Sequence, residues 1–434
     1  MGRGTTGERR AGQWLTDEAV ARAARLAGAV IRVTGRGQGA TLPGLLAERV
    51  APGVTRRRAR RLERVVLVSG TNGKTTTTAM LTAALAADGR RVATNASGSN
   101  LYRGLTTAML EAGPAAQDGV LEVDEAVLPL AIDELWPRLV VLLNLTRDQL
   151  DRHHEVQGLA GRWRAAVGRL PADATVVADV GDPKVAWVAS AAPWAVHVAL
   201  CGRRAGPDGA ACPACGGVLG TGPSGWYRCW MCGWSPPAAT VRVERQDDEI
   251  RLLGEGVRRR ADLLVPTDGC ALDVALAWAA ASRLGADPDR SLAAIGRLGA
   301  VQYRYGDAVY RGVPVRLLLA KNPAGWDEAL TASPDPARPA VVSVNGGGPD
   351  GRDTSWLWDV DMARLSDRPF VVATGARAED VALRLEVAGV TCSVVRPLGE
   401  AISRAGRSPG NRQVDLFMDY TSFVEARELA SRHG

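Results

Sequence analysis

A glycine-rich loop stands between an apolar run and a helical segment, and its residue types are those that hold phosphate groups. The apolar run covers residues 65–69, and the loop and the first helical residues read Gly70, Thr71, Asn72, Gly73, Lys74, Thr75 and Thr76. Where a strand passes into a helix, backbone N–H groups and the helix N-terminus can face an anion. The spacing predicts an ATP-binding phosphate loop, with Lys74 on the β and γ oxygens and Thr75 as a ligand of Mg²⁺.

Four cysteines form two Cys-x-x-Cys pairs with thirteen residues between the pairs. The pairs are Cys212 with Cys215 and Cys229 with Cys232. Four thiolates at this spacing can close tetrahedrally on Zn²⁺ and leave no open position, so the pattern predicts a structural zinc site. Disulfide bonds are the alternative, and they are rare in the cytoplasmic setting that we infer below.

Apolar strands alternate with helical segments around the loop, which predicts a parallel α/β sheet with its site at the strand ends. Residues 119–123 end in acidic residues, and residues 139–145 end in Asn144 and Asp148. Helical spacing is expected at residues 271–284 and 287–298. Further strands of a second α/β pattern are expected at residues 315–319, 340–344, 370–374 and 414–418.

The chain of 434 residues is long enough for more than one hydrophobic core. Helical spacing over residues 14–50 predicts a lead-in that we assign to residues 1–60. We place an ATP-binding α/β domain at residues 61–300, with a zinc ribbon inserted at residues 201–238. A smaller α/β domain is expected at residues 301–434.

The net charge of +6 suits an anionic partner such as a nucleotide, a nucleic acid or a membrane surface. The densest basic cluster contains Arg56, Arg57, Arg58, Arg60, Arg61 and Arg64. We interpret this arginine cluster as a solvated helix end, with contact to anionic lipid headgroups as the alternative. No run approaches the roughly 20 apolar residues of a spanning helix, and residues 1–10 lack the apolar core of a signal peptide. We therefore expect a cytoplasmic protein.

The loop has Val68 where the general phosphate-loop pattern has glycine, and its Gly-Thr-Asn-Gly-Lys-Thr sequence resembles that of the Mur ligases. Residues 121–126 resemble the acidic strand end of that family, which implies that Glu122 binds Mg²⁺. Residues 144–153 resemble the segment after the next strand, which implies that Asn144 belongs to the nucleotide site. The resemblance implies a Mur ligase central domain that uses ATP and Mg²⁺.

Several positions depart from the Mur ligase pattern. Gln149 replaces a metal-binding histidine, and Arg162 and Arg164 lie near the place of a lysine that some members carbamylate. Arginine stays protonated and cannot take that modification. Leu272 and Ala275 stand where relatives keep asparagines against the adenine. These departures concern a second metal site and the recognition of the base.

The short segment before the loop and the four-cysteine insertion resemble the MurT family, the ligase-type subunits of lipid II isoglutaminyl synthase. Residues 318–326 and 350–359 carry the same resemblance, which extends over nearly all of the chain from residue 64. Each of these two stretches follows an apolar strand and contains Gly, Pro or Asp, so turn chemistry alone is the alternative for each.

The MurT resemblance implies amidation of the α-carboxyl of D-glutamate in the stem peptide of lipid II, at the inner membrane surface. ATP would convert the carboxylate to an acyl phosphate, which ammonia then attacks. The ammonia would come from a GatD-type glutaminase partner, because no cysteine of this chain lies in a nucleophile elbow. Cys201, Cys270 and Cys392 are expected to be small buried apolar residues.

The resemblance also implies roles for residues of the last domain. Asp353, with Asp350 as the alternative, would complete a Cys-His-Asp triad whose other two members belong to the partner. Lys321 and Asn322 would line the acyl-phosphate side of the site. Arg304 partly matches a Gly-Arg-Tyr segment of the family and would contact the nucleotide.

Three other functions stay open on the sequence. An autonomous Mur-type or folylpolyglutamate-type ligase would add an amino acid without a partner. A degenerate paralogue would bind its partner without turnover, and Gln149 with the missing adenine asparagines favours this reading. A zinc-ribbon nucleic-acid-binding protein needs more basic residues than Arg203, Arg204 and Arg228 of the insertion, so no nucleic-acid partner is expected.

Overall fold

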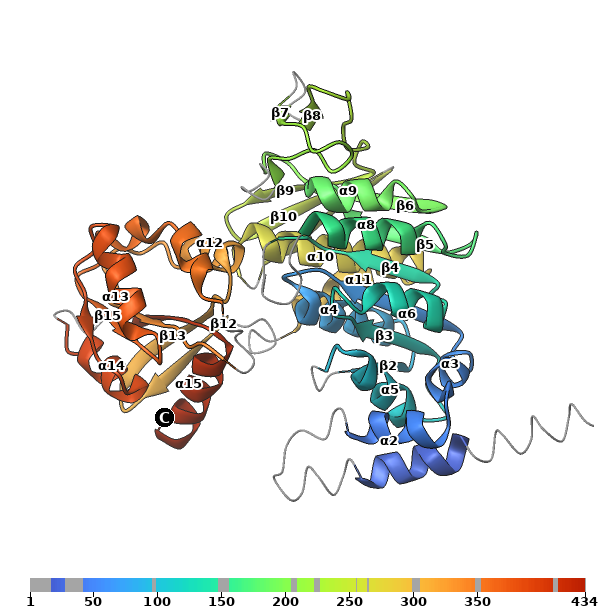
Figure 1. The fold of residues 1–434 in the computed structure, drawn as a ribbon, viewed down its shortest axis with the longest axis horizontal. Coiled ribbons are helices and arrows are strands. Elements are labelled where there is room, and N and C mark those ends of the chain that lie inside the picture. Colours follow the sequence, from blue (N-terminus) through green and yellow to red (C-terminus); the bar gives the residue numbers. More distant parts are fainter. Residues whose placement is uncertain are drawn as a thin grey trace, which may run out of the picture.

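The structure is a computed structural model with two α/β sheets (Figure 1). It describes residues 17–27, 42–95, 99–146, 156–203, 209–221, 227–254, 256–263, 265–298, 305–347, 353–408 and 413–433. The expected fold class is confirmed, because both sheets are built mainly of parallel strands with helices between them.

The larger sheet has nine strands in the order β11-β10-β9-β6-β5-β4-β1-β3-β2. The strands are β1 (Arg64–Ser69), β2 (Val92–Thr94), β3 (Asp118–Glu122), β4 (Leu139–Leu142), β5 (Thr175–Asp179), β6 (Trp194–Leu200), β9 (Val241–Gln246), β10 (Glu249–Gly254) and β11 (Val257–Asp262). The pairings from β2 to β9 are parallel, and β10 and β11 extend the sheet as an antiparallel edge. Strand β1 lies between β3 and β4, so the loop that follows it opens at the centre of the sheet.

Helices cover both faces of this sheet because side chains of β1 alternate between two apolar cores. Val66 and Val68 face a core that includes α4 (Lys74–Ala87), α10 (Asp268–Arg283) and α11 (Pro288–Gly296). Val65 and Leu67 face a second core. The helices of that second face are α5 (Tyr102–Glu111), α6 (Leu128–Leu135), α8 (Val156–Val167) and α9 (Pro183–Ala189). Burial of these apolar side chains holds the strand ends in place.

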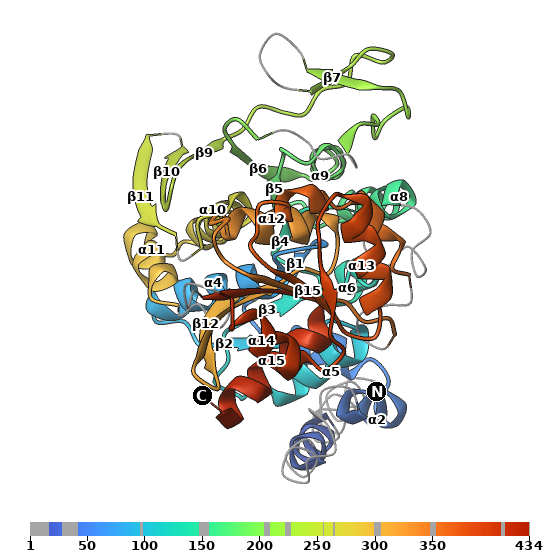
Figure 2. The same cartoon turned by 90° about the vertical axis from the view of Figure 1, so that its left-hand side faces the viewer.

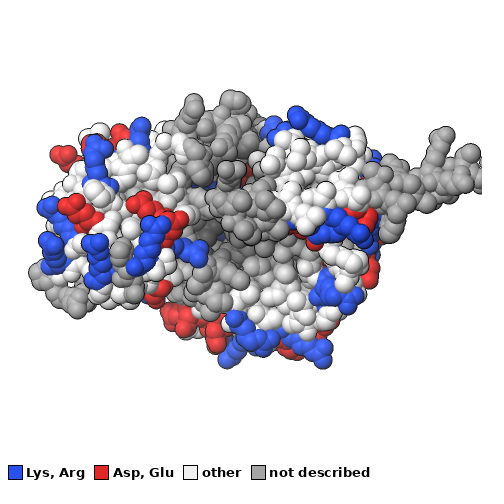
Figure 3. Space-filling model, turned by 90° about the horizontal axis from the view of Figure 1, so that it is seen from below, with Lys and Arg blue, Asp and Glu red and all other residues white. Residues whose placement is uncertain are grey.

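The lead-in is helical over residues 17–27, α2 (Leu42–Val50) and α3 (Val54–Ala59). The arginine cluster begins on α3, and the interpretation of it as a solvated helix end fits only Arg60 and Arg61, which are exposed. Ion pairs of the cluster are Arg56–Glu134 at 2.7 Å, Arg57–Asp17 at 2.8 Å, Arg58–Glu18 at 2.9 Å and Arg64–Asp118 at 2.6 Å. Arg57 and Arg58 therefore tie α3 to the helix at residues 17–27. Arg56 ties α3 to α6, and Arg64 ties β1 to β3. On the described part of the face shown in Figure 3, basic and acidic side chains both occur on each of the two lobes.

The insertion adds a two-stranded antiparallel sheet of β7 (Leu219–Thr221) and β8 (Tyr227–Cys229). This sheet stands away from the rest of the molecule in both ribbon views (Figures 1 and 2). The chain then returns to the large sheet as β9.

The second sheet has the order β12-β13-β17-β14-β15-β16. Its strands are β12 (Tyr305–Tyr310), β13 (Val313–Leu319), β14 (Ala340–Ser343), β15 (Val371–Thr374), β16 (Ser393–Val394) and β17 (Val414–Met418). Its helices are α12 (Pro323–Ala332), α13 (Ala378–Val387), α14 (Leu398–Ala405) and α15 (Tyr420–His433), with short 3-10 helices η4 (Ser355–Asp359) and η5 (Met362–Leu365). Only β12 is antiparallel to its neighbour.

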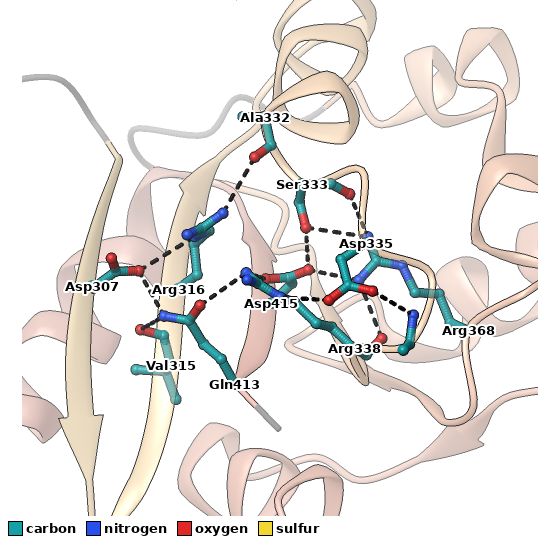
Figure 4. A network of polar contacts seen from close by, with 11 residues as sticks. Asp307, Val315, Arg316, Ala332, Ser333, Asp335, Arg338, Arg368, Gln413 and Asp415 are labelled. Carbon is teal, nitrogen blue, oxygen red and sulfur yellow. Dashed lines mark hydrogen bonds and ion pairs between the residues drawn. The ribbon is translucent and has the colours of Figure 1, made fainter. Parts of the chain in front are cut away.

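A buried ion-pair network fixes β17 in this sheet (Figure 4). Asp415 has no exposed surface and lies 2.6 Å from Arg368 and 3.5 Å from Arg338. Ser333 also donates its hydroxyl to Asp415. A buried carboxylate needs such partners, so this network is structural in character.

Candidate active site

The nucleotide loop, residues 70–73, joins the end of β1 to the start of α4. Gly73 has a φ of 85°, and a Cβ at this position would collide with the Asp273 carboxylate on α10. Only glycine meets both requirements without strain. The helix α4 therefore begins with its free N–H groups at the centre of the sheet edge, as the sequence predicts for a phosphate site.

Lys74 is the first residue of α4 and is 6% exposed. Its ammonium group donates to the carbonyls of Gly70 and Thr71, the latter at 3.2 Å, and lies 3.1 Å from Glu125 Oε2. Glu125 belongs to the acidic segment after β3, but nothing in the sequence assigned it a role. The buried ion pair holds the Lys74 ammonium beside the loop.

Thr75 and Glu122 are brought together at the same edge. The Thr75 hydroxyl donates to Glu122 Oε2 at 2.8 Å, and Asn100 Nδ2 donates to Glu122 Oε1 at 3.3 Å. Asn95 accepts from the Glu122 N–H and donates to its carbonyl, both at 2.8 Å. A hydroxyl and a carboxylate side by side are oxygen ligands of the kind that Mg²⁺ prefers, so these residues fit the expected ion.

Asn144 shapes the loop from the end of β4. Its side chain accepts from Asn72 N–H at 2.9 Å and donates to the Asn72 carbonyl at 3.1 Å. Its own carbonyl accepts from Thr71 N–H at 2.9 Å. In the structure Asn144 is thus a support of the nucleotide loop through three hydrogen bonds.

The second sheet reaches the loop through α12. Asn322 caps this helix, with its side chain accepting from Gly325 N–H at 2.8 Å. The same side chain donates to Asn72 Oδ1 at 3.1 Å. Asn322 is 1% exposed, so the contact is buried. Residues 72 and 322 are 250 positions apart in the sequence, yet they form one hydrogen-bonded unit at the loop.

A cleft of about 550 Å³ opens beside this contact and is lined by residues of both sheets. Lining residues from the loop and its surroundings include Asn72, Gly73, Thr76 and Asn144, and those at the start of α12 include Lys321, Pro323 and Gly325. The size and the shared walls suit a nucleotide-sized ligand between two domains.

Charged residues form the far wall of the cleft. Asp179 at the end of β5 pairs with Arg203 at 2.7 Å. Burial raises the pKa of Asp179 to about 6, although the Arg203 charge opposes the shift. Glu328 on α12 accepts from Gly269 N–H on α10 at 2.9 Å, and burial raises the pKa of Glu328 as well. Carboxylates with perturbed pKa values in a cleft are typical of a functional site.

Asp273 of α10 is one of the site residues that the sequence did not indicate. Asp273 lies against Gly73 and accepts from the Thr77 hydroxyl at 3.1 Å. Leu272 lines the cleft, and Ala275 is fully buried in the apolar core. Asp273 is the acidic residue in the apolar interior of α10, and this position is the only sign of it in the sequence, which does not indicate its contact with Thr77.

Asp353 lies after β14 and just before η4. It accepts from Ser355 N–H at 2.9 Å, and hydrogen bonds from Ser355 lower the pKa of its carboxyl. It is not among the described residues that line the cleft. Arg304, Asp350, Asp148 and Gln149 lie outside the described residues.

The four expected zinc ligands come together in the insertion. The sulfur atoms of Cys212, Cys215, Cys229 and Cys232 all lie within 4.8 Å of one another. Each Cys-x-x-Cys pair is followed by a glycine with a φ of 75°, and these glycines are Gly216 and Gly233. Each glycine donates its N–H to the carbonyl of the first cysteine of its pair, which turns the chain back and aims both thiols inward. The donor set fits tetrahedral Zn²⁺.

All seven cysteines are free thiols, so the disulfide alternative is not supported. Cys270 is buried and Cys392 is half-buried, but Cys201 is exposed, so the expectation of a buried apolar role for Cys201 is wrong. The turn at the end of β6 places it at the surface.

Comparison with known proteins agrees with this architecture. The family described as Mur ligase middle domain matches residues 68–209. A pseudomurein peptide ligase type C from Methanothermus fervidus has a TM-score of 0.66 at 20% identity, covering 85% of this chain and 79% of that one. The MurF ligase from Thermotoga maritima has a TM-score of 0.63 at 18% identity, covering 87% and 83%. Fold and nucleotide loop together define a Mur ligase.

The last domain narrows the class. The family described as MurT ligase C-terminal matches residues 319–423. The MurT subunit of lipid II isoglutaminyl synthase from Streptococcus pneumoniae is 30% identical, over 91% of this chain and 93% of that protein. The corresponding Staphylococcus aureus subunit is 28% identical, over 86% and 88%. The chain belongs to the MurT family, the Mur ligase subunits of the glutamine-hydrolysing lipid II isoglutaminyl synthases.

Among the described residues, no helix has the length and apolarity needed to cross a bilayer.

Proposed function

We propose that this chain amidates the α-carboxyl of D-glutamate in the lipid II stem peptide, using ATP and ammonia released by a glutaminase partner. The observation that carries the proposal is the meeting of the nucleotide loop and the MurT-type domain at one cleft, through Asn72 and Asn322. MurT relatives along most of the chain support the lipid II substrate and the glutamine-derived ammonia.

The chemistry requires activation of the substrate, because a carboxylate repels the nucleophile and lacks a good leaving group. Transfer of the γ-phosphoryl group of ATP to a carboxylate oxygen gives an acyl phosphate. Ammonia then attacks the carbonyl carbon, the C–N bond forms and phosphate leaves with the C–O bond electrons. The proton that the amine loses passes to a base or to water.

The residues of the nucleotide loop fit the first step. The Lys74 ammonium and the N–H groups at the start of α4 would neutralise charge on the transferred group. Thr75 and Glu122 would hold Mg²⁺, which supplies further charge neutralisation when bound. Lys321, on the opposite side of the cleft, would face the acyl phosphate. Arg304 remains our candidate for a nucleotide contact.

The partner would supply the nucleophilic thiol of glutamine hydrolysis. We propose that Asp353 orients the histidine of that partner, with Asp350 as the alternative. Asp353 is not among the described residues that line the cleft, which supports two distinct sites, one for the release of ammonia and one for its use. The four cysteines would hold a structural Zn²⁺.

The two separate sheets support the proposed division into a lead-in at residues 1–60, an ATP-binding domain at 61–300 and a last domain at 301–434. We also propose that the protein works in the cytoplasm at the inner face of the membrane, where a lipid-linked substrate would be found.

A reconstitution experiment tests the proposal. The chain alone should amidate lipid II with ATP and ammonium, and it should use glutamine only when the purified glutaminase is added. Mass spectrometry of the stem peptide would show replacement of one hydroxyl by an amino group. Addition of an amino acid by the chain alone would favour an autonomous ligase, and no turnover with either ammonium or glutamine would favour a degenerate paralogue.

A further inference from the structure

The four-cysteine insertion has a protruding apolar end that the ligase chemistry does not use. Val218, Trp230 and Met231 are 69%, 69% and 75% exposed, and we call these three residues the knuckle tip. Trp230 and Met231 are the two residues between the cysteines of the second pair. An exposed cluster of large apolar side chains on a small module marks an interaction surface.

The knuckle tip is held in shape by two glycines. A Cβ at Gly220 would overlap the Trp230 indole, and a Cβ at Gly217 would lie 2.6 Å from the Met231 sulfur. Trp230 N–H also bonds to the Val218 carbonyl at 3.4 Å. The apolar side chains therefore rest on backbone that has been cleared for them, while their outer surfaces remain open. Such a preformed surface loses little side-chain entropy when it binds.

The charged residues around the knuckle tip indicate what kind of surface would cover the tip. Residues 209–243 contain no Asp or Glu, and both of their charged residues, Arg228 and Arg242, are exposed. Arg228 lies on β8 directly opposite Gly220 and next to Cys229. The end of the insertion is therefore apolar with a positive edge. Tryptophan prefers the headgroup level of a bilayer, and arginine is attracted to anionic lipids.

The position of the β7–β8 sheet in the molecule also favours contact with a lipid surface. The β7–β8 sheet stands out from the rest of the chain in both ribbon views, so it can meet a flat surface before the two large sheets do (Figures 1 and 2). The arginine cluster on α3, the other candidate for lipid contact, is engaged in ion pairs with Asp17, Glu18 and Glu134. These arginines are correspondingly less available to headgroups.

We propose that the knuckle tip docks this chain on an anionic lipid bilayer, with Trp230 and Met231 entering the headgroup region and Arg228 contacting lipid phosphates. The choice of a lipid surface rests in part on the proposed function, because a lipid-linked substrate would have to be reached at the membrane. Zinc would act indirectly, by holding the two cysteine pairs that present the tip.

Vesicle cosedimentation of the full-length, zinc-loaded chain tests the docking proposal. Vesicles of phosphatidylglycerol mixed with phosphatidylcholine should bind the chain, and pure phosphatidylcholine should bind it more weakly. Trp230→Ser combined with Met231→Ser should weaken binding at least about tenfold, given the apolar area removed. Arg228→Glu should weaken binding to the anionic vesicles but leave binding to pure phosphatidylcholine vesicles unchanged. Trp136→Ser, a change at a tryptophan that is 60% exposed at the end of α6, is the matched control and should bind as the parent does.

Zinc content measured on each variant shows whether the insertion is still folded. Met231→Asp provides a second variant that alters an already exposed side chain and should also weaken binding. Equal vesicle binding by the parent and the tip variants, or no binding by the parent, would overturn the proposal. A tip variant that binds vesicles as the parent does, but has lost binding to the glutaminase or has lost self-association, would also overturn the proposal. The assay contains no ATP, glutamine or lipid II, so its failure would leave the proposed ligase function standing.

Discussion

Lys74 and Glu125 show how a buried charge is kept ready at the residue scale. The ammonium group has a carboxylate partner at 3.1 Å and two loop carbonyls, so it is neither solvated nor free to swing away. A charge already in place costs no reorganisation when phosphoryl charge develops. Because Lys74 is buried and paired with Glu125, it also contributes to the stability of the domain.

Lys74→Ala should lower the rate of ATP turnover by at least about a hundredfold, because a donor to the transferred phosphoryl group is lost. It should also destabilise the domain by roughly 3 kcal/mol, since Glu125 is left buried without its partner. Steady-state ATPase assays at a temperature where circular dichroism shows folded protein separate the two effects. Glu125→Gln breaks the same ion pair but keeps the ammonium, and should lose far less turnover. Parent-like turnover in Lys74→Ala would refute the phosphate-loop role.

Asp353→Asn should sharply slow glutamine hydrolysis by the complex with the glutaminase, on the order of a hundredfold or more, because the amide cannot fix the tautomer of the partner's histidine. Complex formation and ammonium-dependent amidation should persist, since Asp353 is not among the residues lining the nucleotide cleft. Glutamate release and lipid II amidation would be assayed in parallel. Full glutaminase activity would move the role to Asp350 or off this chain.

Site residues could be predicted from the sequence where they are close together in the chain. The loop from Gly70 to Thr76 could be predicted because strand, glycines and lysine are consecutive in the chain. Asp273 could not be predicted, because its contact with Thr77 joins residues 196 positions apart. The pairing of Asn72 with Asn322 was hidden for the same reason. A single sequence carries no record of such tertiary contacts.

At the scale of elements, the two cysteine pairs form a unit whose geometry depends on four thiols at once. Cys212→Ser should lose the single Zn²⁺ expected per chain, because a neutral hydroxyl replaces a thiolate poorly. Cys201→Ser, at an exposed cysteine outside the cluster, should keep the metal. Elemental analysis of the freshly purified proteins measures both. Absence of zinc in the parent protein would count against the site.

Four strands of the second sheet, β13, β14, β15 and β17, were predicted closely, because runs such as 340–344 and 414–418 are short, apolar and buried, whereas β12 and β16 were not predicted. In the large sheet, β2, β5 and β6 were missed as well. Strands β9 to β11 were missed for a physical reason. Their burial alternates, and arginines and acidic residues occupy the exposed positions, so they do not have the continuous apolar character of the central strands.

Asp415→Asn should destabilise the second sheet by about 3 kcal/mol, because Arg368 would lose its buried charge partner. Asp335→Asn is the matched control in the same network, where the carboxylate is 41% exposed and pairs with Arg338 at 3.3 Å (Figure 4). That change should cost less than about 1 kcal/mol. Urea unfolding of the two full-length variants compares them, and equal midpoints would contradict the structural reading of the network.

On the scale of the whole molecule, α12 joins the two sheets. Trp326 of this helix is fully buried and stacks on Phe417 of β17, with ring centroids 5.4 Å apart. At its start Asn322 touches the nucleotide loop, and two residues past Trp326 the Glu328 carboxylate accepts from Gly269 at the start of α10. The position of the last domain is therefore tied to the nucleotide site at two points.

Glu328→Ala should raise the KM for ATP by about tenfold, because a charge-assisted hydrogen bond between the two sheets is lost. The kcat at saturating ATP should fall less, since the groups at the phosphates are unchanged. Glu379→Gln removes an exposed carboxylate that pairs with Arg396 within the last domain, and should leave KM as it is. An unchanged KM in Glu328→Ala would show that the contact does not hold the cleft together.

The order of elements along the chain has a consequence for its synthesis. One face of the large sheet is covered by helices that all precede residue 190, whereas the other needs α10 and α11, which follow the insertion. A nascent chain that has reached the cysteine pairs has therefore closed one face and left Val141, Val177 and Val198 without the cover of α10. Exposed apolar surface of this kind attracts chaperones and promotes aggregation. Translation that pauses within the insertion would prolong the state in which this protein is most vulnerable.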